Sequence, residues 1–510
     1  MALPSAASPP LRAGERPYEI MTTSAATSKP AAPPVDQDLD DAPLYEARRQ
    51  IYPQSVKGRL RTIKWIVLAL TLGIYYFLPF IRWDRGPDAP GQAVLIDFPA
   101  RRFYFFFIEI WPQEFYYVAG LLILAALALF LMNAVAGRVW CGYLCPQTVW
   151  TDLFMAVERL VEGDRRERIL ADKAPWTLGK LGRKISTHTL WLLIAWWTGG
   201  AWVLYFADAP TLVVELATFQ APAVAYISIG ILTATTYVLA GHMREQVCTY
   251  MCPWPRIQAA LTDEYALNVT YRYDRGEPRG SVKKAALARA EGQPAGDCID
   301  CHQCVNVCPT GVDIRLGSQL ACIQCGLCID ACNTIMDKVE RPRGLIAYES
   351  EANLEARIAG KPQVLRIVRP RTVLYSLLIV FAAGLMMYGL ASRSNEGLAA
   401  IHDRNPLFVR MSDGSLRNAY TLRLSNKMLV ERSFALSASG VPGAALSVIG
   451  QTAGTAGEIV TIGPDQTREV RVLLTTRDRL PAGASLPVTF TIKDIADGTT
   501  ATAADHFIGP

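Results

Sequence analysis

Five long apolar stretches are the strongest pattern along the chain. They cover residues 63–80, 115–135, 190–206, 222–240 and 373–390, and they lack the alternation or narrow stripe of a soluble element. A helix of about 20 apolar residues crosses the hydrocarbon core of a bilayer. The pattern therefore predicts an α-helical membrane protein with five transmembrane helices.

The distribution of Lys and Arg predicts how these helices are oriented. The loop between the second and third stretches is rich in basic residues: Arg138, Arg159, Arg165, Arg166, Arg168, Lys173, Lys180, Arg183 and Lys184. The turn 207–221 has no Lys or Arg, and the arginines of the loop after the first stretch are accompanied by acidic residues. Because cytoplasmic loops carry the excess of basic residues, we expect a bacterial inner-membrane protein with a cytoplasmic N-terminus, two cytoplasmic cysteine-bearing loops and a periplasmic C-terminal region.

The remaining segments differ in character. Residues 1–55 are rich in Ala, Pro and Ser, which predicts a disordered cytoplasmic tail. We expect a four-helix membrane domain over residues 56–255, a cytoplasmic domain over 256–371 and the fifth transmembrane helix over 372–391. Residues 392–510 contain short alternating stretches separated by Gly, Pro, Asp and Asn, a pattern that predicts a periplasmic immunoglobulin-like β-sandwich.

Composition agrees with a membrane protein of several domains. The chain has 510 residues, a mean hydropathy of +0.18 and a formal net charge of only +5. A charge this small for this length is typical of loops that set membrane topology, and it argues against a nucleic-acid-binding surface.

All twelve cysteines lie in short-spaced groups. Cys141 stands near Cys145 and Cys248 near Cys252, and the other eight form two runs. Clustering of this kind points to metal ligation in a reducing compartment, because ordinary buried thiols are scattered along a sequence.

The two runs of four have the spacing of a bacterial two-cluster ferredoxin. They read Cys298-x2-Cys301-x2-Cys304-x3-Cys308-Pro and Cys322-x2-Cys325-x2-Cys328-x3-Cys332-Asn. In such ferredoxins the fourth cysteine of each run ligates the other cluster. We therefore expect one [4Fe–4S] cluster on Cys298, Cys301, Cys304 and Cys332, and a second on Cys322, Cys325, Cys328 and Cys308. A zinc module is the alternative, but paired zinc knuckles would not produce two interlocking runs of four.

The remaining cysteines form an internal repeat, C-x-Y-x-C-P. Cys141 and Cys145 follow the second apolar stretch, and Cys248 and Cys252 follow the fourth, which suggests a pseudo-two-fold axis that brings the pairs together at the cytoplasmic rim. Because cysteines at i and i+4 share one face of a helix, we expect each pair to lie on one helical face with Cβ atoms about 5–6 Å apart. Four thiolates could then bind a soft ion such as Cu(I), or another cofactor. The alternative is that these small residues only pack where helices meet.

Other candidate groups are weaker. His188 and His242 flank apolar stretches, but no stretch contains a histidine in its interior, so haem is not predicted. Glu109 lies in a Phe-rich segment, where it is either inside the membrane and functional or at the interface and facing water.

The motifs resemble the CcoG family, also called FixG or Rdx, which comprises accessory proteins of cbb3-type cytochrome c oxidase. The resemblance rests on WCGYLCPQTVW at 140–150, REQVCTYMCPWPRIQ at 244–258, the eight ferredoxin cysteines and RPRGLIAY at 341–348. It covers the chain from about residue 45 to its end. Accessory proteins of quinol dehydrogenases and nitrous oxide reductase share the cysteine motifs, whereas the five-span order and the C-terminal sandwich favour the CcoG family.

The resemblance implies a role in oxidase maturation, with reduction of Cu(II) to Cu(I) as the enzymatic activity. In this hypothesis the clusters pass electrons to copper at the catalytic cysteines Cys141, Cys145, Cys248 and Cys252, and the expected partners are the bilayer, a cytoplasmic electron donor and oxidase subunits or copper-delivery proteins. Two other functions stay open. One is an assembly scaffold without enzymatic activity, and the other is a quinol dehydrogenase that feeds periplasmic partners.

Overall fold

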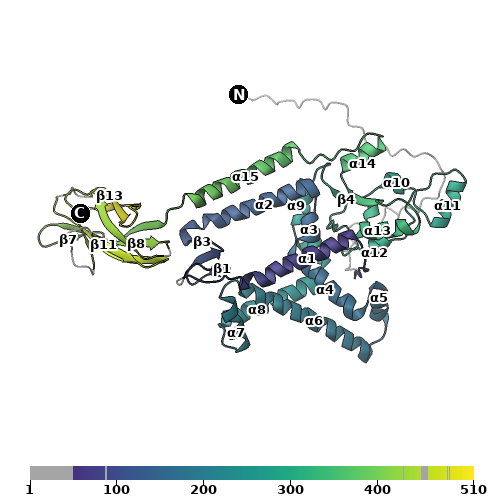
Figure 1. Ribbon diagram of the computed structural model, residues 1–510, viewed down its shortest axis with the longest axis horizontal. Helices are drawn as coiled ribbons and strands as arrows, with labels where there is room; N and C mark the ends of the chain where they lie inside the picture. Colours follow the sequence, from purple (N-terminus) through teal and green to yellow (C-terminus); the bar gives the residue numbers. More distant parts are fainter. Residues whose placement is uncertain (1–49, 87–88, 429, 450–457, 479, 482) are drawn as a thin grey trace, which may run out of the picture. The chain divides into compact units, whose positions relative to one another are not determined.

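The structure is a computed structural model that describes residues 50–510 except 87–88, 429, 450–457, 479 and 482. Residues Ile51–Pro510 form one compact unit. Helices come first along it, a short cysteine-rich region follows, and the C-terminal part consists of strands (Figure 1). Most of the predicted tail lies outside the described residues, but Tyr52 and Ser55 at its end hydrogen-bond to Asp172 and Asp164.

Four helical segments among the described residues are long and apolar enough to cross a membrane. They are Arg59–Phe80, Pro112–Ala136, Ala223–Met243 and Pro370–Ala391, which match four of the five predicted stretches. The other stretch, 190–206, lies largely in helix α6 (Leu178–Val203). The first half of α6 carries basic residues, so its apolar part is shorter than the roughly 20 residues that a span needs. The fifth span stays a prediction.

The helical region contains the following elements: α1 (Arg59–Phe77), η1 (Leu78–Phe80), η2 (Pro112–Glu114), α2 (Tyr116–Ala136), α3 (Val139–Tyr143), α4 (Pro146–Glu162), α5 (Arg165–Lys173), α6, α7 (Ala209–Ala217), α8 (Ala223–Thr236), η3 (Tyr237–Met243), η4 (Val247–Met251) and α9 (Trp254–Leu261). Glycine allows close helix contacts here. A Cβ on Gly199 of α6 would lie 2.9 Å from the carbonyl oxygen of Ile229 on α8. Small residues at such crossings are typical of helix packing in membranes.

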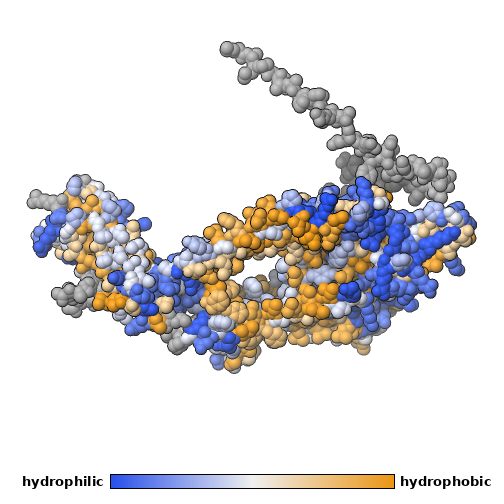
Figure 2. Space-filling model, turned by 45° about the horizontal axis from the view of Figure 1, so that its top comes forward, coloured by the Kyte–Doolittle hydropathy of each residue, from blue (hydrophilic) through white to orange (hydrophobic). Residues whose placement is uncertain are grey.

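The surfaces of the long helices are apolar. Hydrophobic residues gather over the middle of the molecule in Figure 2, and hydrophilic residues cover the cysteine-rich region at the right of that view. Individual side chains agree with this picture, since Leu122 on α2 and Phe381 on α15 (Pro370–Ala391) are 67% and 70% exposed. An apolar surface of this extent needs lipid around it.

A small sheet precedes α2 and was not predicted from the sequence. It consists of β1 (Val94–Asp97), β2 (Arg102–Phe105) and β3 (Ile108–Ile110), paired antiparallel in the order β1-β2-β3. Glu109 lies in β3, where its carboxylate is mostly buried and 3.1 Å from Arg102 Nη1. Glu109 therefore does not face water, contrary to one of the two expectations, and its place inside the membrane stays a prediction.

The cysteine-rich region is framed by two strands far apart in sequence. Strand β4 (Asn268–Tyr271) pairs antiparallel with β5 (Ile346–Glu349), and Met336, Leu345 and Ile346 are buried beside them. The other elements are α10 (Tyr273–Gly276), α11 (Val282–Ala290), α12 (Gln303–Asn306), η5 (Ile314–Leu316), α13 (Leu327–Lys338) and α14 (Glu351–Ile358).

The C-terminal part is a sandwich of two antiparallel sheets. One sheet has the order β10-β12-β8-β6, with β7 also paired to β8, and the other has the order β11-β9-β13-β14. The strands are β6 (Glu396–His402), β7 (Val409–Arg410), β8 (Leu416–Asn426), β9 (Arg432–Ser439), β10 (Ala445–Val448), β11 (Glu458–Ile462), β12 (Gln466–Thr476), β13 (Ser485–Asp494) and β14 (Thr500–Ile508). Tyr420, Leu422, Phe434 and Phe490 are fully buried between the sheets. Alternate residues of long strands such as β8 therefore face the core, as in other β-sandwiches.

Candidate metal centre

The eight ferredoxin-type cysteines line two neighbouring cavities. The distal cavity is lined by Cys298, Cys301, Cys304 and Cys332. The proximal cavity is lined by Cys308, Cys322, Cys325 and Cys328, and Cys304 borders it too. Each cavity thus combines three cysteines of one run with the fourth cysteine of the other run.

Left-handed backbone positions let each run curl around its cavity. His302 (φ 55°) lies between Cys301 and Cys304, and Gln324 (φ 54°) and Gly326 (φ 72°) flank Cys325. Positive φ is uncommon outside glycine and marks a tight turn. The turns direct three thiols to one side, and helix α13 supplies Cys332 to the distal cavity.

These cavities suit a polynuclear cluster better than a single ion. Around one zinc ion with Zn–S bonds of about 2.3 Å, tetrahedral sulfurs would be roughly 3.8 Å apart. Among the residues that the structure describes, no three cysteine sulfurs come within 4.8 Å of one another. Burial also raises the pKa of Cys304 and Cys332 to about 12, so thiolates here need a cationic partner. An iron–sulfur core supplies such a partner, and the donor set fits it.

All four cysteines of the C-x-Y-x-C-P repeat line a third cavity. This thiol cavity has a volume of about 190 Å³, and its lining includes Cys141, Cys145, Cys248, Cys252 and also Cys322. The pairs therefore meet, and they meet next to a cysteine of the proximal cavity. The sulfurs are nevertheless too far apart for three of them to surround one ion in the arrangement described.

The cysteines of each pair do not lie on one helical face. Cys141 is inside α3, but Cys145 has extended dihedral angles (φ −61°, ψ 127°) and precedes α4, and Cys252 is extended in the same way after η4. The expectation of a shared face was wrong because each second cysteine precedes a proline, which disfavours the helical conformation at that position.

The first motif is packed directly against the proximal turn. The Tyr143 hydroxyl donates a hydrogen bond to the carbonyl of Cys325 (3.0 Å), and a Cβ on Gly142 would lie 2.8 Å from the carbonyl oxygen of Ile323. The second motif has Thr249 in place of Gly142, and its Tyr250 is 61% exposed. Of the two motif tyrosines, Tyr143 is therefore the one bonded to the proximal turn, whereas Cys248 of the second motif packs against the hydrophobic cluster that contains Ile323 and Cys325.

Thiols in the thiol cavity have few polar partners. Cys141 Sγ donates to Gln258 Oε1 at 3.3 Å. Burial, followed by the proximity of the other cysteines, raises the pKa of Cys141 and Cys248 to about 12. The thiols stay protonated at neutral pH unless a bound cation replaces the protons.

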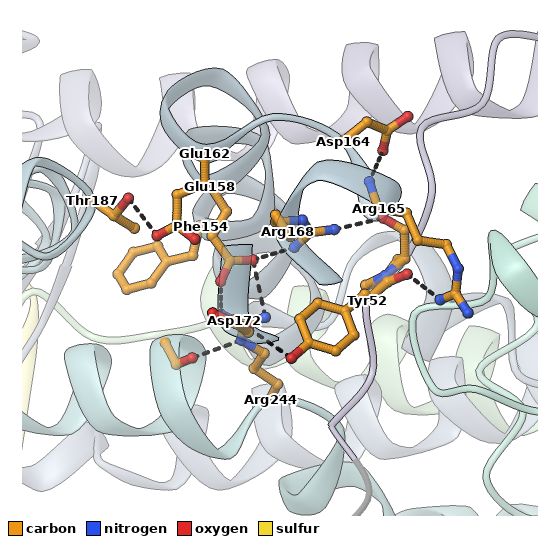
Figure 3. A network of polar contacts seen from close by, with 12 residues as sticks. Tyr52, Phe154, Glu158, Glu162, Asp164, Arg165, Arg168, Asp172, Thr187 and Arg244 are labelled. Atoms are coloured by element: carbon orange, nitrogen blue, oxygen red, sulfur yellow. Dashed lines mark hydrogen bonds and ion pairs between the residues drawn. The ribbon is translucent and has the colours of Figure 1, made fainter. Parts of the chain in front are cut away.

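A buried ionic network holds the start of the second motif. Arg244 Nη2 lies 2.6 Å from Glu158 Oε1 on α4, and Arg168 on α5 binds the other oxygen of Glu158 at 2.7 Å (Figure 3). Arg244 precedes η4, which has the i→i+5 bonding of a π-helix, as does η3 before it. Such segments are frequent at functional sites.

The two histidines face each other rather than a metal ligand set. His188 Nδ1 lies 2.9 Å from the Tyr237 hydroxyl, and the rings of His188 and His242 are 5.7 Å apart and nearly parallel.

The sequence did not single out Gln258 or Gln324 at the cavities, and Arg138 was interpreted only as a topology signal. The signal in the sequence that could have identified Arg138 is that an arginine stands just before each C-x-Y-x-C-P motif (Arg138 and Arg244).

Comparison with known proteins places these motifs in described families. Residues 243–351 match a family described as "4Fe-4S dicluster domain", residues 118–162 a "4Fe-4S binding domain", and residues 386–510 an "IG-like fold at C-terminal of FixG".

Three relatives align over most of the chain. The nitrogen fixation protein FixG of Rhizobium meliloti is 50% identical in an alignment of 470 residues that covers 86% of this chain and 88% of FixG. Protein RdxB of Cereibacter sphaeroides is 48% identical (90% and 96% covered), and RdxA of the same organism is 51% identical (89% and 94% covered).

Proposed function

The chain belongs to the family of FixG and the Rdx proteins, and from this membership we propose its function. It is a membrane-bound iron–sulfur electron-transfer protein that serves the assembly of a cbb3-type cytochrome c oxidase, and it acts as a cupric reductase. The observation that carries the proposal is the thiol cavity, in which both cysteine pairs meet Cys322 of the proximal cavity.

The cluster ligands follow from the cavity linings. Cys298, Cys301, Cys304 and Cys332 hold the first [4Fe–4S] cluster, and Cys322, Cys325, Cys328 and Cys308 hold the second. When bound, the clusters supply one-electron transfer. The chain's part is to bury their thiolates among apolar side chains such as Ile314 and Met336 and to keep the two sites adjacent.

Shared cysteines define an electron path through the protein. Cys304 borders both the distal and the proximal cavity, and Cys322 borders both the proximal and the thiol cavity. The exposed Cys301 puts the distal cavity at the surface, where an electron donor can approach. Electrons therefore enter at the distal cysteines and leave at the thiol cavity.

We infer that copper is the substrate of the thiol cavity because the cavity gathers four soft thiol donors. Thiolate ligands favour Cu(I) over Cu(II), so binding through Cys141, Cys145, Cys248 and Cys252 makes the one-electron reduction of Cu(II) easier. Ligation releases the thiol protons. Because no three of these sulfurs are close enough for one ion in the described arrangement, the proposal requires that copper binding draws the two motifs together.

The basic loops support a cytoplasmic placement of all twelve cysteines. Arg159 lies near the end of α4, Arg165 begins α5 and Arg183 lies in the first turns of α6, on the side of the helices that carries the cysteine motifs. With that side in the cytoplasm, the sandwich is periplasmic, where oxidase subunits or copper-delivery proteins can bind it. Reporter fusions after residues 176 and 510 should give opposite cytoplasmic and periplasmic signals.

A single-turnover assay tests the reductase. Anaerobically purified protein is reduced, freed of reductant and mixed with Cu(II), and Cu(I) is trapped with a specific chelator. We expect about two Cu(I) per chain, one for each cluster. Cys322→Ser should lower this yield by half or more, and Cys141→Ser with Cys145→Ser should leave the clusters reducible while slowing the transfer at least tenfold.

Tyr250→Phe is the matched control, since Tyr250 is in the second motif but exposed. It should behave like the unaltered protein. Copper reduction that is unchanged in the cysteine variants would contradict the proposal and favour a scaffold.

A further inference from the structure

Arg138 is a buried cation between the proximal cavity and the thiol cavity. It is 8% exposed, and Gly137, which adopts φ 54°, separates it from the end of α2. Arg138 lines the thiol cavity together with Cys141 and Cys322. The chain is fixed here by a hydrogen bond from the Arg138 amide to Gln324 Oε1 (2.7 Å), so the arginine is tied to the proximal turn itself.

Backbone carbonyls alone hold the side chain of Arg138. Nη1 donates to the carbonyls of Leu320 (2.7 Å), Gln319 and Cys322 (both 3.3 Å), and Nη2 donates to that of Pro255 (3.2 Å). Carbonyl oxygens satisfy the donors but bring no negative charge. An arginine does not lose its proton in a protein, so the positive charge stays uncompensated.

The other buried arginines of the described residues all have carboxylate partners. Arg61 pairs with Asp152, Arg168 and Arg244 share Glu158 (Figure 3), and Arg369 pairs with Asp263. No carboxylate in the described part of the chain lies within 4.0 Å of the Arg138 guanidinium. The nearby cation Lys64 differs too, since Asp152 lies 3.8 Å from its Nζ.

A charge this buried must be offset by another charge, and the cysteines of the two cavities are the groups at hand. Cys322 and Cys141 act on Arg138 in the sense expected of anionic neighbours: burial lowers the pKa of the guanidinium, and these two thiols raise it. A cluster on Cys322 becomes more negative by one charge when it is reduced, and a fixed cation beside it favours that state.

We propose that Arg138 is a charge-compensating residue that raises the reduction potential at the proximal cysteines above that at the distal cysteines. The added electron is thereby held next to the thiol cavity, where copper is reduced. This inference rests on the proposed function, because it requires a cluster at Cys308, Cys322, Cys325 and Cys328.

Redox titration of the full-length protein, followed by electron paramagnetic resonance, tests the proposal. Arg138→Gln keeps a hydrogen-bond donor but removes the charge. It should lower the equilibrium constant for reduction of one of the two clusters about tenfold, which is about 59 mV for a one-electron couple, and leave the other cluster unchanged. Arg138→Lys keeps the positive charge, so the potential of this cluster should stay close to that of the unaltered protein.

Arg369→Gln is the matched control, because Arg369 is as buried, also binds a carbonyl near the end of α2 (that of Ala134), and is already paired with Asp263. The reduction potential of neither cluster should change in this variant. An Arg138→Gln protein with two clusters and unchanged potentials would overturn the proposal, as would an Arg138→Lys protein shifted as far as Arg138→Gln.

A second pair of variants tests the same charge without altering Arg138. Leu320 is 54% exposed and lines the thiol cavity, so Leu320→Glu can supply the missing carboxylate. It should lower the equilibrium constant for reduction of the same cluster about tenfold, and Leu320→Gln should not. If the Arg138→Gln protein does not hold both clusters, the two Leu320 variants provide the test instead. Equal reduction potentials in the Leu320→Glu and Leu320→Gln proteins would overturn the proposal. Unaltered protein without clusters would instead refute the proposed function.

Discussion

Tyr143 and Tyr250 occupy the same position in the two C-x-Y-x-C-P motifs, yet their surroundings differ. Tyr143 is buried, and its hydroxyl donates to the carbonyl of Cys325 at 3.0 Å, whereas Tyr250 is 61% exposed. The repeat in the sequence suggested two equivalent sites. In the structure, Tyr143 of the first motif is the tyrosine that hydrogen-bonds to the proximal turn, although Cys248 of the second motif also packs near that turn.

Tyr143→Phe should weaken the proximal site. The variant leaves the Cys325 carbonyl without this donor, which should lower the stability of the proximal site by about 1–3 kcal/mol. Iron should therefore be lost to an external chelator several times faster than from unaltered protein. Tyr250→Phe should lose iron at the unaltered rate, and equal loss from both variants would contradict the asymmetry described.

Gly142 shows why a motif alone could not predict this contact. The position is Gly in one copy and Thr249 in the other, which gives no hint that a Cβ on the first would meet the Ile323 carbonyl at 2.8 Å. Gln258 and Arg138 were missed for the same reason. Their partners lie more than a hundred residues away, and no local spacing records such contacts.

At the scale of elements, the sheet before α2 is joined to the sandwich by buried charges. Arg102 on β2 donates from Nη2 to the carbonyl of Asp465 (2.7 Å), just before β12, and also pairs with Glu109 on β3. Lys427 reaches Glu114 at 2.7 Å. The sequence did not predict the sheet, because its strands are only three or four residues long and lie in a Phe-rich stretch.

This junction should be sensitive to pH. Burial, and next the carboxylate of Asp465, raise the pKa of Glu109 from 4.5 to about 7. A carboxyl group with a raised pKa stabilises the folded junction when protonated, so this stabilisation is complete below pH 4.5 and is lost as pH rises through 7. Hydrogen exchange in β2 and β3, corrected for intrinsic rates, should speed up several-fold from pH 6 to pH 8.

Glu109→Gln should abolish this pH dependence, because the amide cannot ionise. Glu469→Gln is the control, since Glu469 pairs with Arg423 on the exposed face of the sandwich and should leave the dependence intact. If the Glu109→Gln variant kept the same exchange profile as unaltered protein, another group would be the one that titrates.

At the scale of the whole molecule, the sandwich and the cysteine cavities lie in different parts of one compact unit. The cavities are lined by residues between Leu129 and Ile346, and no residue of the sandwich contributes to them. Removing residues 396–510 should therefore leave iron content and single-turnover copper reduction within twofold of the full chain. Oxidase maturation in cells should fail if the sandwich binds the partner, and loss of both activities would contradict this division.

Long-range sequence patterns predicted the coarse architecture well. Four apolar helices, the iron–sulfur region and the C-terminal sandwich all follow from residue patterns that act over ten residues or more. α6 departs from the pattern because basic residues and glycines interrupt its first half. The prediction that each cysteine pair lies on one helical face was wrong because the prolines at 146 and 253 disfavour a helical conformation at the preceding cysteine.

The most direct measurement is the iron, sulfide and copper content of anaerobically purified full-length protein, with electron paramagnetic resonance of the reduced state. The account predicts about eight irons and eight sulfides per chain and the signals of two [4Fe–4S] clusters. It also predicts that the thiol cavity takes up copper. About twelve irons per chain would place a third cluster at Cys141, Cys145, Cys248 and Cys252 and contradict the copper site, and iron-free protein that still reduces Cu(II) would contradict the account as a whole.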